Sequence, residues 1–126
     1  MFVGDQCGKA EEAMALYTSL FADSRIVEVE RYGPDEPGTG VKQARFVLAG
    51  TEHRAMDSDG PHQFTFTPAT SLFVECDNEA ELDAAYAALA EGGAVLMPLQ
   101  AYPFSPKFAW LADRYGVSWQ LFLTAA

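Results

Sequence analysis

The sequence is short of positive charge. Its 126 residues include eight Lys and Arg against eighteen Asp and Glu, which gives a formal net charge of −10 at pH 7. A protein that binds nucleic acid or an anionic membrane needs a basic surface to neutralise phosphate groups, so we expect neither partner. No apolar run approaches the roughly 20 residues needed to span a bilayer. The first residues also lack the basic and apolar regions of a secretory signal, which favours a cytoplasmic protein.

Residue types that support metal or nucleophilic chemistry are also scarce. The only cysteines, Cys7 and Cys76, do not form a Cys-x-x-Cys pair, so a zinc site is not indicated. We interpret both as small buried hydrophobic residues with reduced thiols. The histidines, His53 and His62, have no serine elbow or Cys-His context, which argues against a nucleophilic triad.

The sequence does contain an internal repeat. Residues 2–29 align with residues 71–98 at a constant offset of 69, and Cys7 then falls on Cys76. Each copy has the pattern of a short strand, a polar turn and an amphipathic helix. Self-similarity of this length indicates a duplicated structural unit, and two copies are too few for a solenoid. The repeat predicts two halves related by a pseudo-twofold axis, with a cleft where they meet.

The apolar spacing predicts the same order of elements in each half. A helix begins near Ala10, and a second begins after Asn78, a capping residue, and ends at Gly92. We expect Tyr17 and Tyr86 to be buried on the apolar stripes of these helices. The predicted strands are 2–7, 24–32, 41–50 and 51–57 in the first half and 71–76, 94–100, 107–113 and 117–124 in the second, with loops at 34–40, 57–68 and 98–106. This order gives an α+β fold of two βαβββ modules, about 1–57 and 69–126, within a single domain of residues 1–126.

Four segments of the sequence resemble a known family. The runs GKAEEAMALYTSLF, VKQARFVLAG, ATSLFVEC and WLADRYGVSWQLF are similar to the PhnB-like, or 3-demethylubiquinone methyltransferase-like, branch of the vicinal oxygen chelate superfamily. That superfamily includes glyoxalase I, extradiol dioxygenases and the bleomycin- and fosfomycin-resistance proteins. The resemblance implies paired βαβββ modules that form a U-shaped sheet around a cavity, commonly in a homodimer. A Rossmann-type methyltransferase would need a Gly-rich turn after a strand, and none is present, so the residues do not support methyl transfer.

The same resemblance implies where a divalent metal would be held. Three of the four ligand positions fall on Phe2, Ser71 and Gln120, and the fourth falls on His53, Ala55 or Asp57. Phenylalanine has no donor atom, serine is a poor neutral ligand, and an amide lacks the charge of a carboxylate. We therefore predict that the chain has lost the metal and needs no cofactor.

Period-two alternation along the strands predicts which side chains line the cavity. The predicted lining is aromatic with a few polar groups: Phe2, Gln6, Ser71, Phe73, Glu75, Gln120 and Phe122. Such a lining suits a small, partly apolar ligand with hydrogen-bonding groups. We interpret Trp110 and Trp119 as core residues.

Three functions remain open from the sequence. The first is metal-free binding or sequestration of a small ligand. The second is a metal-dependent lyase, isomerase or dioxygenase, which needs His53 or Asp57 together with Gln120 in one coordination sphere. The third is a metal-free enzyme that uses Glu75 as an acid or base. Whether the protein is an enzyme is not decided by the residues.

Overall fold

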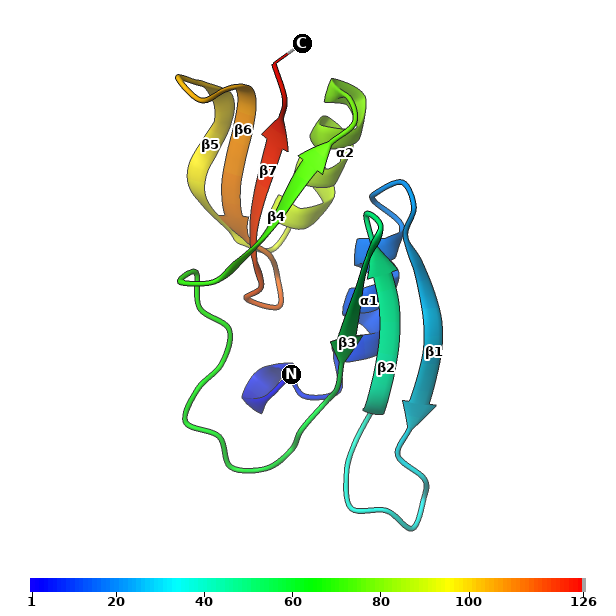
Figure 1. Cartoon of the computed structure of the whole chain (residues 1–126). Helices are drawn as coiled ribbons and strands as arrows, with labels where there is room; N and C mark the ends of the chain where they lie inside the picture. Colours follow the sequence, from blue (N-terminus) through cyan, green and yellow to red (C-terminus); the bar gives the residue numbers. More distant parts are fainter. Residues whose placement is uncertain (126) are drawn as a thin grey trace. The chain divides into compact units, whose positions relative to one another are not determined.

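The computed structural model describes residues 1–125 and divides the chain into two compact units, Met1–Thr65 and Phe66–Ala126. Each unit has one α-helix and its own β-sheet (Figure 1). The elements of unit 1 are η1 (Gly4–Gln6), α1 (Ala10–Thr18), β1 (Arg25–Arg31), β2 (Val41–Leu48) and β3 (Thr51–Ala55). Those of unit 2 are β4 (Ser71–Cys76), α2 (Glu79–Ala90), β5 (Ala94–Tyr102), β6 (Ser105–Ala112) and β7 (Ser118–Leu123).

The two units repeat one topology. In unit 2 the strand order is β4-β7-β6-β5, and β4 pairs with β7 in parallel while the other neighbours are antiparallel. In unit 1 the order is β1-β2-β3, and Phe2 forms a single parallel bridge with Asp57, just after β3. This bridge occupies the place that β4 has in unit 2. The α+β class and the two related modules are thus confirmed, with α1 and α2 beginning at Ala10 and Glu79, at the predicted offset.

The predicted strand at residues 2–7 is wrong beyond its first residue. Gly4 adopts a left-handed φ of 57°, and residues Gly4–Gln6 form a short 3₁₀ helix instead of continuing beside β3. Glycine accepts this conformation without the steric cost that a side chain would bring. The turn means that Phe2, Gly4 and Gln6 do not share one face of a strand.

The predicted loop at 98–106 is also corrected, because β5 continues through Pro98 to Tyr102 and β6 begins at Ser105. Proline has no N–H to donate, so within sheets it is tolerated on edge strands. β5 is the edge strand of its sheet, and its pairing with β6 contains several register shifts. Proline is typical of loops, but Pro98 is tolerated here because β5 lies at the edge of the sheet.

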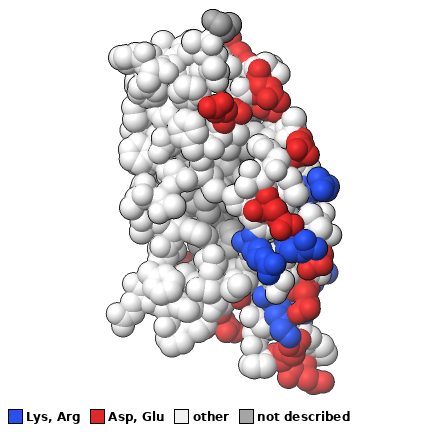
Figure 2. All heavy atoms as spheres, viewed as in Figure 1, with Lys and Arg blue, Asp and Glu red and all other residues white. Residues whose placement is uncertain are grey.

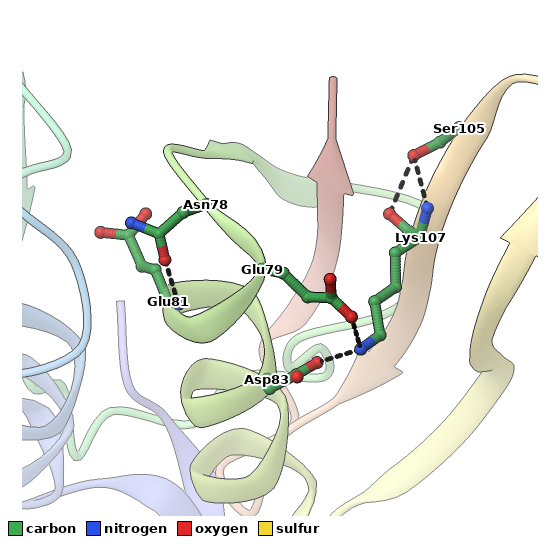
Figure 3. Close-up of polar contacts among 6 residues, drawn as sticks. All are labelled: Asn78, Glu79, Glu81, Asp83, Ser105 and Lys107. Atoms are coloured by element: carbon green, nitrogen blue, oxygen red, sulfur yellow. Dashed lines mark hydrogen bonds and ion pairs between the residues drawn. The ribbon is translucent and has the colours of Figure 1, made fainter. Parts of the chain in front are cut away.

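Helix α2 is fixed to one side of the unit 2 sheet. Asn78 caps it by accepting a hydrogen bond from the Glu81 backbone N–H at 2.8 Å, as the sequence predicted. From β6 the Lys107 ammonium reaches Glu79 at 2.8 Å and Asp83 at 2.6 Å (Figure 3). The pKa of Lys107 is raised chiefly by these hydrogen bonds, those to Asp83 first. The contacts hold the helix against β6 and leave the other side of the sheet uncovered by α2.

The core of unit 2 lies between α2 and the sheet. Its largest side chain is Trp119, which is fully buried and whose Nε1 donates to Asp113 at 2.9 Å. Trp119 is therefore a core residue, as predicted, whereas Trp110 is only half-buried and the prediction for it is wrong. Tyr86 is likewise half-buried, although Tyr17 of α1 is buried as expected.

A rotation of α2 explains why Tyr86 is not the counterpart of Tyr17. The two helices bury residues with the same spacing: Ala10, Ala13 and Tyr17 in α1, and Leu82, Ala85 and Leu89 in α2. Each buried residue of α2 therefore comes three positions later in the chain than the sequence repeat would place it. Because each helical residue turns about 100°, α2 presents a face rotated by roughly 60°.

Among residues 1–125, no helix is long and apolar enough to cross a membrane.

Candidate functional site

One side of the unit 2 sheet, which we call the open face, carries most of the predicted ligand-binding residues. The strand register places Phe73 of β4 opposite Gln120 of β7, and Gln120 opposite Trp110 of β6. Neighbours in register project from the same side of a sheet. On the opposite side, Leu111, Trp119 and Leu121 are fully buried beneath α2. The open face comprises Ser71, Phe73, Glu75, Phe108, Trp110, Ser118, Gln120 and Phe122.

Aromatic rings form a row across the open face. The rings of Phe73 and Phe122 are 5.5 Å apart, and Phe122 stands opposite Phe108 in the register. Phe108 in turn meets the edge of Phe104 at 4.9 Å and of Tyr102 at 5.7 Å. Phe73 and Phe104, at the two ends of the row, are each 54% exposed. Large apolar side chains with this exposure, gathered on one face of a sheet, suit contact with an apolar ligand.

A chain of hydrogen bonds lies beside the aromatic row. The Trp110 Nε1–H donates to the Ser118 hydroxyl at 2.8 Å, and the Ser118 and Ser71 hydroxyls are 2.6 Å apart. Ser118 is 2% exposed, whereas Ser71 is half-buried. Either serine hydroxyl is able to act as the donor in the bond between them, because each has one proton and two lone pairs. In either direction the Ser71 hydroxyl keeps hydrogen-bonding capacity for a group above the sheet.

Gln120 adds an amide between the aromatic side chains. It follows the turn Asp113–Gly116, in which Asp113 accepts hydrogen bonds from the backbone N–H groups of Tyr115 and Val117. The Gln120 side chain is half-buried, and among residues 1–125 no hydrogen-bond partner is found for its amide. An amide offers one acceptor and two donors, so this position is able to pair with polar groups of a ligand.

The open face has little charge. Its single ionisable side chain is Glu75, which is exposed beside Phe122. Figure 2 shows no acidic or basic side chain over β5 and β6 in this view, whereas those of both signs gather over β1 to β3. Residues 92–106, which include all of β5, contain no Asp, Glu, Lys or Arg. An acid/base role for Glu75 would need burial among phenylalanines, and the side chain is instead open to solvent.

The remaining predicted lining residues belong to unit 1. Phe2 is 5% exposed, and its backbone is held by hydrogen bonds with Met56 and Ser58. Gln6 ends η1 and is half-buried. Five of the seven predicted residues thus share the open face of unit 2, and a ligand-binding role for Phe2 and Gln6 stays a prediction.

The donor set implied for a metal does not fit one. Phe2 offers no donor, and the Ser71 hydroxyl is engaged with Ser118. His53 stacks on Phe46 with ring centroids 5.4 Å apart. Within residues 1–125 no group of three or more His, Cys, Asp or Glu side chains is arranged to hold a metal ion. We derive no metal chemistry from these residues.

Asp57, the remaining ligand candidate, is used by the backbone of unit 1. The side chain is 1% exposed, and its Oδ1 accepts from the N–H groups of Gly8 at 2.7 Å and Ala10 at 3.1 Å. Its Oδ2 accepts from the N–H of Val41 at 2.8 Å. Ala10 opens α1, so the carboxylate also stands where the helix dipole favours negative charge. Asp57 therefore joins three chain segments through hydrogen bonds to both of its carboxylate oxygens.

The glycines near Asp57 have a packing role. A Cβ at Gly38 would lie 2.6 Å from the Tyr32 ring, and one at Gly40 would lie 2.4 Å from Asp57 Oδ2. Gly38 and Gly40 are therefore needed for close approach of the backbone to these two side chains. This explains the Gly-Thr-Gly sequence without a nucleotide.

Both cysteines are free thiols, but only Cys76 is buried; Cys7 is half-buried, which corrects that prediction. Burial, followed by the charges of Glu81 and Asp77, raises the pKa of Cys76 to about 12. Burial and the charge of Asp57 also raise the pKa of Cys7. Neither thiol therefore has the lowered pKa that marks a reactive cysteine.

Five residues of the site were missed from the sequence. Phe108 and Trp110 had a readable signal, since both occupy alternate positions of the predicted strand 107–113 and therefore share a face. Ser118 had the same signal on the last strand. Tyr102 and Phe104 lay in a segment interpreted as a loop, so no alternation was available to place them.

The chain is similar to proteins of known structure and to one sequence family. Residues 1–122 match the 3-demethylubiquinone-9 3-methyltransferase family. A PhnB protein from Bacillus cereus, which bears 3-demethylubiquinone-9 3-methyltransferase as a provisional name, is 54% identical with a TM-score of 0.88, over 93% of this chain and 92% of its own. The protein PA1353 from Pseudomonas aeruginosa is 25% identical with a TM-score of 0.82, over 98% and 93% of the two chains.

More distant structures share only the fold. A glyoxylase/bleomycin resistance protein/dioxygenase domain from Frankia is 20% identical with a TM-score of 0.59, over 90% of this chain and 88% of its own. No curated protein matches the chain. The chain belongs to the 3-demethylubiquinone-9 3-methyltransferase family.

Proposed function

We propose that this protein binds a small, partly apolar ligand on the open face of unit 2, without a metal. The observation that carries the proposal is the half-buried Gln120 amide, which has no partner among the described residues and stands between Phe73 and Trp110. A few polar groups within an apolar surface fix the orientation of a ligand, while the apolar area supplies affinity.

The family name does not extend the proposal to methyl transfer. To bind a methyl donor that contains adenosine, the protein would need a Gly-rich turn at the end of a strand. Such a turn lets the protein backbone approach the polar groups of the donor. Gly38 and Gly40 lie in a loop and are accounted for by contact with Tyr32 and Asp57. The residues therefore give the name no chemical support.

The competing function is a metal-dependent lyase, isomerase or dioxygenase. Such an enzyme would hold a divalent ion through His53 or Asp57 together with Gln120. The Asp57 carboxylate already accepts three backbone hydrogen bonds, so recruiting it would break up unit 1. This cost favours binding without metal over the metalloenzyme.

Partners and location are part of the same proposal. We propose a homodimer, because short sheets leave edge strands that pair readily with another copy. The net charge of −10 disfavours nucleic acid and anionic membranes as partners. Two free thiols suit the reducing cytoplasm.

The proposal is tested by ligand-observed NMR with small ring compounds, both aromatic and saturated, on protein treated with a chelator. We expect some of them to bind, and we expect Gln120→Ala to weaken those that carry hydrogen-bonding groups about tenfold. Absence of binding across both classes would refute the proposal. Binding that appears only after Zn²⁺, Mn²⁺, Ni²⁺ or Fe²⁺ is added would favour the metalloenzyme.

The matched control is Gln43→Ala, which removes the same half-buried side chain from β2 of unit 1, outside the open face. It should leave the affinity unchanged within about twofold, whereas Gln120→Ala should not. An equal loss in both variants would show that the amide at position 120 has no special role.

A further inference from the structure

The ends of the aromatic row differ from its centre in exposure. Phe108, at the centre, is 3% exposed because Tyr102 and Phe104 pack against it. Phe73 and Phe104 are each 54% exposed. A ring that is half open to water at the end of a packed row has a free surface on which another ring is able to stack.

The geometry within the row is that of mutual aromatic packing. Tyr102 and Phe104 are stacked with ring planes 11° apart, and Phe104 meets Phe108 edge-on at 82°. Phe73 and Phe122 are tilted by 39° at 5.5 Å. Offset-stacked and edge-on arrangements at such separations are the favourable ones for aromatic rings. A planar aromatic ligand would extend this packing, and a saturated ring would fill the same space without it.

The polar groups beside Phe73 indicate which substituents a bound aromatic ligand should have. Ser71, two residues from Phe73 on β4, uses only part of its hydrogen-bonding capacity in its contact with Ser118. Gln120, opposite Phe73, has a free amide. Both groups suit an oxygen substituent on the ring, such as a hydroxyl or a carbonyl.

The negative charge of Glu75 on the open face disfavours anionic aromatic ligands. Glu75 lies two residues from Phe73 on the same side of β4, and no basic residue shares the open face. A ligand with a negative charge would be repelled by this carboxylate, while a neutral or cationic one would not. The net charge of −10 acts in the same direction.

We infer that the ligand class of the open face is a planar aromatic ring with an oxygen substituent and no negative charge, stacked on Phe73 and hydrogen-bonded to Ser71 or Gln120. This inference rests on the proposed function and specifies its ligand. It concerns the chemistry of the ring and names no individual compound.

The test compares matched probes by isothermal titration and by quenching of Trp110 fluorescence. The probes are 2-naphthalenemethanol, its saturated decahydro counterpart, and 2-naphthalenesulfonate, which is anionic. We expect the aromatic alcohol to bind about tenfold more tightly than the saturated one, and the sulfonate to bind weakest. Equal binding of the two alcohols would overturn this inference and leave the proposed function standing. Binding of neither alcohol would overturn both.

Variants of the face complete the test. Phe73→Leu keeps an apolar side chain without the ring, so it should weaken the aromatic alcohol about tenfold and leave the saturated alcohol within about twofold. Glu75→Gln should improve binding of the sulfonate. The control is Tyr86→Leu, which removes a half-buried ring from α2, on the other side of the sheet. A loss in Tyr86→Leu equal to that in Phe73→Leu would show that stacking on Phe73 is not the cause.

Discussion

The Oδ2 atom of Asp57 lies so close to Gly40 that a Cβ at position 40 would be 2.4 Å from it. Gly40 also has a left-handed φ of 84°, which side chains rarely adopt. This closeness lets Asp57 reach the N–H of Val41 at 2.8 Å and tie the start of β2 to the end of β3. The stability of unit 1 therefore depends on a glycine and a carboxylate acting as a pair.

We expect Asp57→Ala to destabilise the protein by about 3–5 kcal/mol, because three backbone N–H groups lose their acceptor in a buried setting. Asp57→Asn should cost roughly half as much, since an amide keeps one accepting oxygen and turns its NH₂ group toward the other donors. Gly40→Ala should cost at least ~2 kcal/mol through the unfavourable φ and the contact with Asp57.

Urea unfolding of the three variants measures these effects. The control is Gly60→Ala, because a Cβ there meets only ordinary contacts and its φ is not in the left-handed region. A free energy of unfolding for Asp57→Ala within about 1 kcal/mol of the unsubstituted protein would contradict the role assigned to Asp57.

Stability should fall at high pH partly because of Cys76. Its pKa is about 12 in the folded protein, raised by burial from the usual value near 9. Above about pH 9 the unfolded chain loses the thiol proton while the folded protein retains it, so ionisation favours the unfolded state. The loss should grow as the pH rises toward the folded pKa.

The measurement is the free energy of unfolding at steps between about pH 8 and pH 11, for the unsubstituted protein and for Cys76→Ala. The alanine variant should show a shallower decline, because other groups that titrate in this range are shared by both proteins. The control, Cys7→Ala, removes a thiol that is only half-buried and should change the slope less. Parallel curves for Cys76→Ala and the unsubstituted protein would refute the assignment.

Much of the fold could be predicted because periodicity and repetition both act locally. The two helices and the seven strands β1 to β7 are found close to their predicted positions, and Asn78 caps α2 as its sequence context indicated. The errors come from tertiary context. Pro98 is acceptable in β5 only because that strand is at the sheet edge, and Tyr86 loses its buried position because α2 is rotated against its sheet.

The candidate site was predictable in part for the same reason. Alternation places Ser71, Phe73 and Glu75 on one side of β4, and Gln120 and Phe122 on one side of β7. It does not reveal that Ser118 and Trp110 form a hydrogen-bonded chain with Ser71, because that contact depends on which strands are neighbours. Strand order is a long-range property that no local pattern encodes.

The proposed homodimer is expected to involve the uncharged edge strand β5. Val95 and Leu96 are 44% and 42% exposed, and β5 has no charged residue, whereas β1 carries Arg and Glu along its length. Charged side chains on an edge strand discourage pairing between copies, so β1 is protected and β5 is less so. Light scattering should give twice the chain mass of 13.7 kDa.

Leu96→Lys should convert the dimer to a monomer, because it places a charge on the pairing edge. The matched control is Val27→Lys on β1, at a residue that is 39% exposed, and it should remain dimeric. A monomer mass for the unsubstituted protein at tens of micromolar would rule out the dimer. A dimer that survives Leu96→Lys and dissociates with Val27→Lys would move the contact to β1.

The last prediction concerns metal content. Metal affinity depends on the number and charge of the ligands, and the implied positions offer a phenyl ring at Phe2, a hydroxyl at Ser71 and an amide at Gln120. Protein purified without a chelator should therefore contain well under one equivalent of Zn, Ni, Mn or Fe by elemental analysis. The informative variants are His53→Ala and Gln120→Ala, since neither side chain is among the residues that hold Asp57 in place. Near-stoichiometric metal that is lost in both variants would place the two residues in one coordination sphere and promote the metalloenzyme over the binding protein. Metal lost only on substitution of Cys7 or Cys76 would instead identify a thiolate ligand, which the raised pKa values of both thiols disfavour.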